Sequence, residues 1–317
     1  MSTTTATRDP GAPFANLRMT MSRWGIEVGP LRHLAAERER LAALTWEHFD
    51  ARPLAATIGA VIDGVDLTAA LAEPVVAELR RALLDYKVLF FRDQPLTPAQ
   101  HVAFARRFGE LELHPFIPAN GEQPELVRFA KSAQVGGYEN SWHSDVSWRE
   151  RPSMAAVLHA VEVPATGGDT LFADMCAAYD GLDDTTKAEI DELSAVHDFI
   201  LAFAAQVKPG EEARVRALYP PAVHPVVRTH GETGRKLIYV NRTFTDRIVG
   251  LADDESTELI GRLSRQAETV EYQCRWSWEP HSVAMWDNRA VQHYACSDYW
   301  PAVRVMERAS IIGERPV

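Results

Sequence analysis

The first third of the chain carries hydrophobic residues at helical spacing, followed by short runs that are hydrophobic throughout. In residues 30–49, leucines recur at helical spacing with charged residues between them, which predicts an amphipathic helix. Residues 73–87 have the same periodicity and predict a second helix, and the run VLFF that follows predicts a fully buried strand. In the sequence TPAQ, Thr97 as N-cap and Gln100 three residues later predict the start of a third helix.

The pattern changes after His114 to short β-type runs separated by Pro, Gly, Asn and Asp. These runs are MAAVLHAV, HPVVRT, KLIYV, SVAMW and RVMERASII. Their spacing favours an antiparallel sandwich or barrel over alternating βαβ units, with helical insertions near 185–194 and 253–265. We therefore expect a mainly β fold with peripheral helices. Residues 53–317 would form the main domain, and residues 1–52 an N-terminal extension with a disordered start and then a helix.

Charge and cysteine content exclude several classes of protein. The chain has 33 Lys and Arg against 44 Asp and Glu, and its formal net charge of −11 argues against a nucleic-acid-binding surface, which needs clustered cations. No apolar run approaches the roughly 20 residues that span a bilayer, and we find no secretory signal pattern. Three scattered cysteines are too few for a disulfide framework or a thiolate zinc site. We expect a cytoplasmic protein that acts on a small molecule.

The segment WHSDVSW contains the first candidate for metal chemistry. His143 and Asp145 are two residues apart, and in a β-strand their side chains would point to the same face. Two histidines and one carboxylate form the facial triad of non-haem Fe(II) oxygenases, which leaves open positions on the metal. A lone H-x-D pair is a weak signal, because an exposed histidine beside a turn aspartate gives the same pattern.

The C-terminal part of the chain offers a third ligand and two candidate anion-binding residues. His293 precedes a predicted strand that carries Arg304 and Arg308 within an otherwise apolar run. Residues four apart in a strand share a face, so both guanidinium groups could enter one cavity. A guanidinium can hold a carboxylate through two parallel charge-assisted bonds, which suits a dicarboxylate. Arginines taken alone are more often solvated surface charges.

Several ordered motifs resemble the taurine dioxygenase (TauD/TfdA) family of Fe(II)/2-oxoglutarate-dependent dioxygenases. They are RDQPLTPAQ, FGELELHPF, WHSDVSW, PATGGDTLFADMCAAY, YVNRTFTDRIVGL and WDNRAVQHYACSDY followed by RVMERASIIG. The resemblance implies a distorted double-stranded β-helix, also called a jelly roll or cupin-like fold. It also implies Fe(II), with 2-oxoglutarate and O2 as co-substrates and succinate and CO2 as co-products. The implied iron ligands are His143, Asp145 and His293, and Thr170 and Arg304 would bind 2-oxoglutarate.

The same resemblance assigns the substrate pocket. By position, Arg308 would receive the anionic group of the substrate, a sulfonate or alkyl sulfate. His114, Phe203 and Phe244 match other pocket positions, and Ile117 and Glu139 occupy further pocket positions where the residue differs. Ile117, Glu139 and Ala202 replace a tyrosine, an asparagine and a serine of the taurine enzyme. Each buried polar group of taurine left unpaired costs roughly 1–3 kcal/mol, so these replacements argue against taurine as the preferred substrate. Glu139 either points into the pocket or turns to solvent.

Other functions remain possible at this level. Within the enzyme class, the same arginine could bind a carboxylate such as an amino-acid derivative, which would then be hydroxylated. Outside it, the fold could be a non-catalytic cupin-like module that binds a metal or ligand. The family resemblance further suggests a homo-oligomer, either a dimer or a tetramer.

Several conspicuous residues have a structural interpretation. We interpret Trp276 and Trp278 as aromatic residues that pack in a sheet. Asp287 and Asn288 are expected to form a turn that orients the strand bearing His293.

Overall fold

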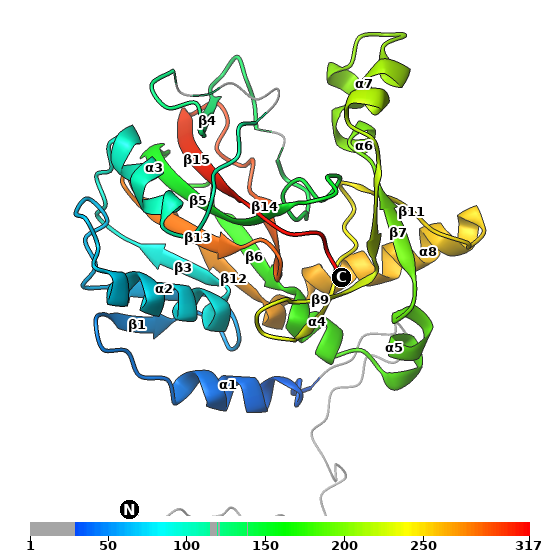
Figure 1. Cartoon of the computed structure of the whole chain (residues 1–317), viewed down its shortest axis with the longest axis horizontal. Coiled ribbons are helices and arrows are strands. Elements are labelled where there is room, and N and C mark those ends of the chain that lie inside the picture. Colours follow the sequence, from blue (N-terminus) through cyan, green and yellow to red (C-terminus); the bar gives the residue numbers. More distant parts are fainter. Residues whose placement is uncertain (1–28, 115–118, 120, 138) are drawn as a thin grey trace, which may run out of the picture. The chain divides into compact units, whose positions relative to one another are not determined.

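The described part of the chain is built around a seven-stranded sheet. The computed structural model describes residues 29–114, 119, 121–137 and 139–317. The strand order is β1-β2-β3-β13-β5-β15-β4, and neighbouring strands are antiparallel except β2 and β3, which are parallel. The strands are β1 (Asp50–Pro53), β2 (Ala60–Asp63), β3 (Val88–Phe91), β4 (Leu126–Lys131), β5 (Ser153–Glu162), β13 (Val283–Asp287) and β15 (Arg304–Ile312). We call this the major sheet (Figure 1).

The chain divides into two units, Met1–Arg32 and His33–Val317, and every element named here lies in the second. The disordered start predicted for the extension lies outside the described residues. Helix α1 (Leu34–Ala42) is shorter than the amphipathic stretch predicted over 30–49. Strand β1, which pairs with β2, ends at Pro53, the residue where we expect the main domain to begin.

A second, three-stranded sheet packs on one face of the major sheet. It has the order β12-β6-β14, with β12 (Gln273–Trp276), β6 (Thr170–Asp174) and β14 (Val291–Ala295), and its strands are antiparallel. The core between the two sheets is rich in aromatic residues: Phe90 stacks on Trp276 at 4.3 Å between ring centroids, and Phe172 lies 5.7 Å from Trp286. Two packed antiparallel sheets with helices outside agree with the mainly β fold predicted from the sequence.

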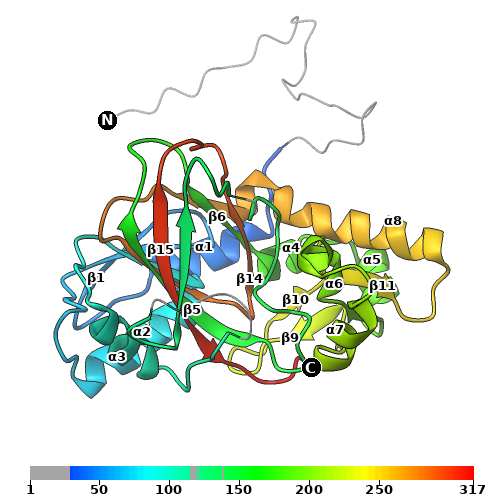
Figure 2. The ribbon, with the colours of Figure 1, turned by 90° about the horizontal axis from the view of Figure 1, so that it is seen from above.

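Helices cover the opposite face of the major sheet, and their apolar residues join one hydrophobic core, to which the first helix contributes Leu41. The helices are α1, α2 (Glu73–Tyr86) and α3 (Pro98–Arg106), and Figures 1 and 2 show α2 and α3 lying along this side of the sheet. Side chains alternate along a strand, so β5 and β15 send one set of residues to the inter-sheet core and the next set to these helices. The predicted capping box at Thr97 and Gln100 is present at the start of α3. The major sheet therefore has two buried faces.

The remaining elements lie between β6 and β12 in the sequence. They are α4 (Met175–Asp180), α5 (Asp184–Ile190), β7 (Ser194–His197), α6 (Ile200–Phe203), α7 (Glu212–Leu218), β8 (Ala222–Pro225), β9 (Val227–Thr229), β10 (Lys236–Ile238), β11 (Thr245–Ile248), α8 (Asp253–Ser264) and three short 3-10 helices (Ala204–Gln206, Arg265–Glu268 and Val270–Tyr272). They include two small sheets, β11-β7-β8 and β10-β9. The predicted helices are present as α5, which ends four residues earlier than expected, and α8.

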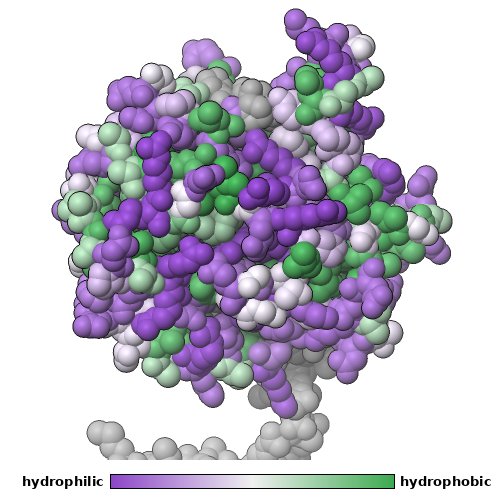
Figure 3. All heavy atoms as spheres, in the orientation of Figure 1, coloured by the Kyte–Doolittle hydropathy of each residue, from purple (hydrophilic) through white to green (hydrophobic). Residues whose placement is uncertain are grey.

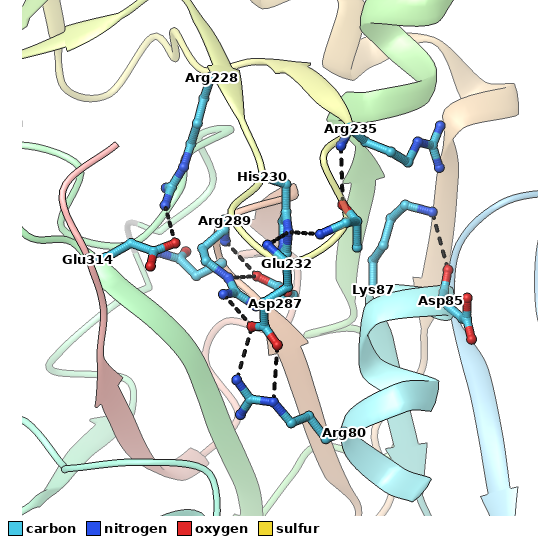
Figure 4. A network of polar contacts seen from close by, with 12 residues as sticks. Arg80, Asp85, Lys87, Arg228, His230, Glu232, Arg235, Asp287, Arg289 and Glu314 are labelled. Carbon is cyan, nitrogen blue, oxygen red and sulfur yellow. Dashed lines mark hydrogen bonds and ion pairs between the residues drawn. The ribbon is translucent and has the colours of Figure 1, made fainter. Parts of the chain in front are cut away.

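A buried polar network stabilises the turn after β13. Asp287 accepts hydrogen bonds from His230 Nε2 at 3.0 Å and from Arg289 Nη2 at 2.7 Å, and Glu232 joins Arg289 to Arg80 (Figure 4). Burial alone would raise the pKa of Asp287, but Arg289 and His230 outweigh burial and hold the pKa below its usual range. The network fixes the WDNR turn from which β14 begins, as the sequence predicts.

The surface of the molecule is largely hydrophilic on the face that Figure 3 shows. On the face shown in Figure 3, hydrophobic side chains are scattered among a majority of hydrophilic ones. Within residues 29–114 and the later described ranges, no helix is long and apolar enough to cross a bilayer.

Candidate metal centre

His143, Asp145 and His293 come together at one end of the space between the two sheets. His143 forms an isolated β-bridge with His293 of β14, through N–H···O contacts of 3.1 and 2.8 Å. Nε2 of each histidine lies 3.8 Å from Oδ1 of Asp145, and one candidate ligand atom from each residue lies within 4.8 Å of the others. The three residues that the sequence proposed as iron ligands therefore meet in space.

The prediction that His143 and Asp145 lie together in a β-strand is wrong. Only His143 makes a β-bridge, whereas Asp145 begins a turn, and the next residue, Val146, has φ of 46°. A β-branched residue at positive φ is strained by about 1–3 kcal/mol and persists only where its surroundings enforce it. Asn288 provides this constraint: its Oδ1 accepts from the Asp145 backbone N–H at 2.7 Å, and its Nδ2 donates to the Asp145 carbonyl at 3.0 Å. A turn held by a distant side chain, and not a regular strand, points the carboxylate at the histidines.

The donor set suits a divalent metal. Nδ1 of His143 lies 2.7 Å from the Ser141 carbonyl oxygen, so this nitrogen carries the proton and Nε2 presents a lone pair. Burial lowers the pKa of His293 to about 3, which keeps its imidazole neutral. Burial opposes ionisation of Asp145, but Arg308 and the two histidines outweigh it and lower its pKa to about 2. Two imidazoles and an ionised carboxylate, whose Oδ2 is buried without a partner in the described part of the chain, fit Fe(II).

A pocket beside the triad contains the proposed 2-oxoglutarate residues. Its lining includes Thr170 of β6, Arg304 of β15, His143 and His293, and we call it the Arg304 pocket. Arg304 is buried and pairs with no carboxylate among the described residues, which leaves its charge available for an anion. The desolvation that accompanies burial lowers the pKa of this guanidinium from its ordinary value.

Two neighbouring residues fix the geometry of the Arg304 pocket. Nε1 of Trp278 donates to Oγ1 of Thr170 at 2.9 Å, so the hydroxyl hydrogen remains free to donate into the pocket. Gly168 has φ of +72°, and a Cβ there would lie 3.2 Å from Cδ and Nε of Arg304. The GGD segment of the sequence therefore needs glycine both for its backbone conformation and for the approach of Arg304.

A second pocket adjoins the first on the other side of His143. Its lining includes His114, Phe203, Phe244, Asp145 and Arg308, and we call it the Phe244 pocket. Arg308 lines both pockets, and its Nη1 donates to Oδ1 of Asp145 at 2.7 Å. Burial first, and then the nearby arginines, lower the pKa of His114 to about 3. An anion that enters this pocket would meet a neutral His114 and a charged Arg308.

The structure describes two of the three pocket residues that differ from the taurine enzyme. Glu139 lines both pockets, and its Oε1 lies 2.7 Å from Nζ of Lys131, so its side chain turns toward the cavity. Ala202 belongs to α6 and packs beside the aromatic cluster of Phe199 and Phe244. Ile117 lies outside the described residues.

Comparison with known proteins identifies the family. The family model "Taurine catabolism dioxygenase TauD, TfdA family" matches residues 50–310. The chain belongs to the TauD/TfdA family. The predicted enzyme class, a 2-oxoglutarate-dependent non-haem iron dioxygenase, is thereby confirmed, together with Fe(II) as cofactor and 2-oxoglutarate and O2 as co-substrates of the class.

Individual family members show the extent of the similarity. The chain is 37% identical over 276 residues to an alpha-ketoglutarate-dependent sulfate ester dioxygenase of Pseudomonas putida, covering 84% of this chain and 91% of that protein. It is 34% identical over 287 residues to an alpha-ketoglutarate-dependent 2,4-dichlorophenoxyacetate dioxygenase of Cupriavidus pinatubonensis, covering 84% and 99%. The crystal structure of a taurine dioxygenase from Burkholderia xenovorans superposes with a TM-score of 0.75 at 37% identity, covering 86% and 91%. The predicted jelly-roll fold of the family is thus confirmed.

Three residues support the candidate site through contacts that local sequence patterns do not reveal. Asn288 and Trp278 were interpreted as turn and packing residues, yet they hold Asp145 and Thr170 through hydrogen bonds from distant segments. Lys131 contacts Glu139, and alternation along β4 places it on the same face as Val127, in agreement with its burial. Alternation was the available signal for Lys131, whereas no local pattern reveals the contacts of Asn288 and Trp278.

Proposed function

We propose that this family member oxidises an alkyl sulfate ester or alkyl sulfonate with O2 and 2-oxoglutarate, with succinate and CO2 as co-products. We assign His143, Asp145 and His293 to iron, Thr170 and Arg304 to 2-oxoglutarate, and Arg308 to the anionic head of the substrate. The observation that carries the substrate assignment is the place of Arg308, which lines both pockets and contacts Asp145. An anion on this guanidinium lies next to the proposed metal ligands.

The metal ligands are oriented before any ligand arrives. The Ser141 carbonyl fixes which nitrogen of His143 is protonated, and Asn288 holds the Asp145 backbone on both sides of the residue. Iron(II) held there supplies the redox chemistry that couples O2 reduction to decarboxylation of 2-oxoglutarate and to oxidation of a substrate C–H bond. The chain contributes position, because the carbon oxidised is the one held closest to the metal.

The Arg304 pocket is suited to the remote carboxylate of 2-oxoglutarate. A buried guanidinium can form two parallel charge-assisted hydrogen bonds with a carboxylate. The Thr170 hydroxyl, which already accepts from Trp278, can donate a third hydrogen bond. A buried cation without a protein carboxylate is costly in the free enzyme, and binding of the dicarboxylate removes that cost.

The charges of the Phe244 pocket favour a substrate with a single negative charge. Once 2-oxoglutarate is matched by Arg304 and the metal, Arg308 remains for one anion. Glu139, the lining carboxylate that could receive the ammonium group of taurine, is paired with Lys131 at 2.7 Å. Phe203 and Phe244 offer an apolar wall for an alkyl chain. An alkyl sulfate has one negative charge, no cation and an apolar chain, so it matches the pocket better than taurine does.

The chemistry of a sulfate ester gives a distinctive product. Hydroxylation of the carbon that carries the ester oxygen yields a hemiacetal ester, which breaks its carbon–oxygen bond to the sulfate. The products are an aldehyde and inorganic sulfate, and the analogous sulfonate reaction releases sulfite. The sulfate ester dioxygenase of Pseudomonas putida, at 37% identity, supports this choice of substrate class.

A substrate panel tests the proposal. Purified enzyme with Fe(II), ascorbate and 2-oxoglutarate would be given a medium-chain alkyl sulfate, the matching alkanesulfonate, taurine and an aryloxyacetate, with succinate, sulfate and sulfite measured together. We expect succinate in step with sulfate or sulfite release, and weak turnover of taurine. Turnover of the aryloxyacetate alone, or formation of succinate without release of sulfate or sulfite, would contradict the substrate assignment.

A carboxylate substrate is the second candidate. The 2,4-dichlorophenoxyacetate dioxygenase of Cupriavidus pinatubonensis is 34% identical over nearly its whole length, and Arg308 could bind a carboxylate as it binds a sulfate. In that case the aryloxyacetate would be the best substrate of the panel, and the sulfur compounds would give only uncoupled succinate.

Arginine variants separate the two anion sites. Arg304→Gln should raise the KM for 2-oxoglutarate, and Arg308→Gln should raise the KM for the primary substrate, each by roughly tenfold to a hundredfold for the loss of about 1.5–3 kcal/mol. Equal effects of both variants on both KM values would contradict the two assignments.

We also propose a homo-oligomer and a domain that begins near Pro53. Helix α1 of the extension connects to the domain through Glu37, which lies 3.5 Å from Lys87 Nζ and 2.9 Å from Arg235 Nη1. Light scattering after gel filtration measures the oligomeric number, and deletion of residues 1–28 tests whether the start of the extension affects activity. We expect a dimer or tetramer with undiminished turnover in the deletion variant.

A further inference from the structure

A second cluster of potential metal ligands lies on the opposite face of the major sheet from the iron site. It consists of His101 of α3, His159 of β5 and Glu307 of β15, and one ligand atom from each lies within 4.8 Å of the others. Glu307 and His159 are direct neighbours across the β5–β15 pair. Their sequence neighbours Leu158 and Arg308 line the Arg304 pocket, so alternation turns the cluster away from it, toward α3. Figure 1 shows α3 beside these two strands.

The cluster is a polar site in an apolar layer. The exposed fractions of His101, His159 and Glu307 are 0%, 3% and 5%. Around them, α3 packs on the sheet through Val102, Phe104 and Ala105 of the outer hydrophobic core. A polar group removed from water destabilises the folded state unless another interaction replaces the hydrogen bonds that it loses. An occupant that binds the unpartnered atoms of this cluster would remove that cost.

The unused atoms of the cluster are donors to a cation. Nε2 of His101 lies 3.0 Å from the Val157 carbonyl oxygen, which can only accept, so this nitrogen carries the proton and Nδ1 keeps its lone pair. That Nδ1 is buried and has no partner in the described ranges, and the same holds for Nε2 of His159. Glu307 pairs through Oε1 with Arg128 at 2.5 Å, which stabilises the ionised carboxylate and leaves Oε2 for another contact.

Electrostatics argue against a proton as the occupant. Burial lowers the pKa of His101 to about 3 and that of His159 to about 4, so both imidazoles are neutral near pH 7. Neighbouring imidazoles act in the same direction as burial: His159 further lowers the pKa of His101, and His281 further lowers the pKa of His159. Two neutral imidazoles and a carboxylate are the ligand types of zinc and related metals.

We propose that His101, His159 and Glu307 form a second metal site, separate from the iron centre, that takes a divalent transition metal such as zinc. Three protein ligands would leave one position for a water molecule. Ligand atoms around a tetrahedral zinc lie roughly 3.3 Å apart, so the side chains close by up to about 1.5 Å when the metal binds. The site joins α3 to β5 and β15 and has no contact with either active-site pocket. Because none of the three ligands lines either pocket, the metal would serve to hold α3 against the sheet, and the proposal is independent of the proposed function.

The first experiment leaves the cluster intact and removes the iron site. The variant Asp145→Ala/His293→Ala would be stripped with a chelator, incubated with Zn(II), desalted and analysed for metal per chain. We expect one bound zinc per chain and a rise in Tm with zinc, because binding to the folded state alone stabilises it. Cobalt(II) in the same protein should give the visible absorption of tetrahedral coordination. A zinc content no higher than that of a metal-free carrier protein treated alongside would overturn the proposal.

A second set of variants assigns the bound zinc to the cluster. In the same background, His101→Leu and His159→Leu should each remove the zinc and the zinc-dependent rise in Tm. His281→Asn is the matched control, because His281 stacks on His159 at 5.9 Å but lies outside the cluster and is exposed. It should retain one zinc. Retention of zinc by both leucine variants, or its loss in the His281 control alone, would place the metal elsewhere and overturn the proposal. Should one leucine variant fail to fold, Glu307→Gln gives the same comparison.

Discussion

Replacing Asn288 by alanine tests how the iron site is held in shape. The Asn288 side chain accepts one hydrogen bond from the Asp145 N–H and donates to the carbonyls of Asp145 and Ser153, at 2.7, 3.0 and 3.0 Å. A buried neutral hydrogen bond contributes about 1 kcal/mol, and a buried group left without a partner costs about 1–3 kcal/mol. With three bonds lost, Asn288→Ala should lower the free energy of unfolding by about 3–5 kcal/mol.

The same substitution should weaken iron binding. Without Asn288, the strained turn at Val146 can relax and move the Asp145 carboxylate away from the histidines. Removal of groups that orient metal ligands typically reduces metal affinity about 10–100-fold, and we expect a loss in this range. Asn288→Asp keeps the acceptor and loses both donors, so its effects should be intermediate. Urea unfolding of the metal-free protein and anaerobic Fe(II) titration measure the two quantities.

A second buried asparagine provides the control. Asn241 is fully buried and makes three side-chain hydrogen bonds, to Ser147 and to the backbone of Thr243 and Phe244, but none to Asp145. Asn241→Ala should lose a similar amount of stability and keep its iron affinity. If Asn288→Ala weakens iron binding no more than Asn241→Ala does, Asn288 does not position the ligand.

Three further predictions concern separate parts of the molecule. Gly168→Ala should raise the KM for 2-oxoglutarate, because its Cβ would press on the arginine assigned to that ligand. Gly234→Ala, at a similar φ of +68° but with open space around it, should cost only about 1 kcal/mol of stability and leave the KM unchanged. Trp278→Phe removes the hydrogen bond to Thr170, worth about 1 kcal/mol, and should raise the KM for 2-oxoglutarate about fivefold. A change confined to the KM for the primary substrate would contradict the role of Thr170 in binding 2-oxoglutarate. Burial, and secondarily a neighbouring histidine, lower the pKa of His197 from 6.5 to about 3, so the unfolded chain takes up the proton first. The contribution of neutral His197 to the free energy of unfolding is full above pH 6.5 and is lost as the pH falls toward 3, by up to about 1.4 kcal/mol per pH unit. In urea unfolding, the free energy of unfolding of His197→Asn should therefore depend less steeply on pH over this range.

The parts of the site that depend on local periodicity could be predicted from the sequence. Arg304 and Arg308 are four residues apart in a strand, and the structure buries both on the same face of β15. Side-chain alternation along a strand does not depend on which strands are its neighbours, so it can be inferred from the sequence alone. Helices α2 and α3 and the buried strand β3 were predictable from other local signals, which are helical periodicity, a capping box and a continuous apolar run.

The conformation around Asp145 could not be predicted in this way. The H-x-D spacing suggested a strand, but positive φ at Val146 is enforced by Asn288, which lies 143 residues from Asp145 in the sequence. The interaction of Glu139 with Lys131 was also open, because a loop carboxylate has no periodic pattern to show which way it turns. In both cases a contact between separate segments decides the local geometry.

The order of the strands was equally hidden. Strand β13 inserts between β3 and β5, and β15 lies between β5 and β4, so the sheet joins the beginning, middle and end of the domain. The same long-range pairing sets Glu307 beside His159 and brings α3 over both. No spacing within the chain connects His101, His159 and Glu307, and the cluster became visible only in three dimensions.

Anomalous diffraction at the iron edge, from crystals grown anaerobically with Fe(II) and 2-oxoglutarate, would test the central claim most directly. We predict an iron peak about 2.1 Å from one nitrogen each of His143 and His293 and from a carboxylate oxygen of Asp145, with 2-oxoglutarate reaching from it to Arg304. An iron peak bound by other residues, or 2-oxoglutarate bound away from Arg304, would contradict the account.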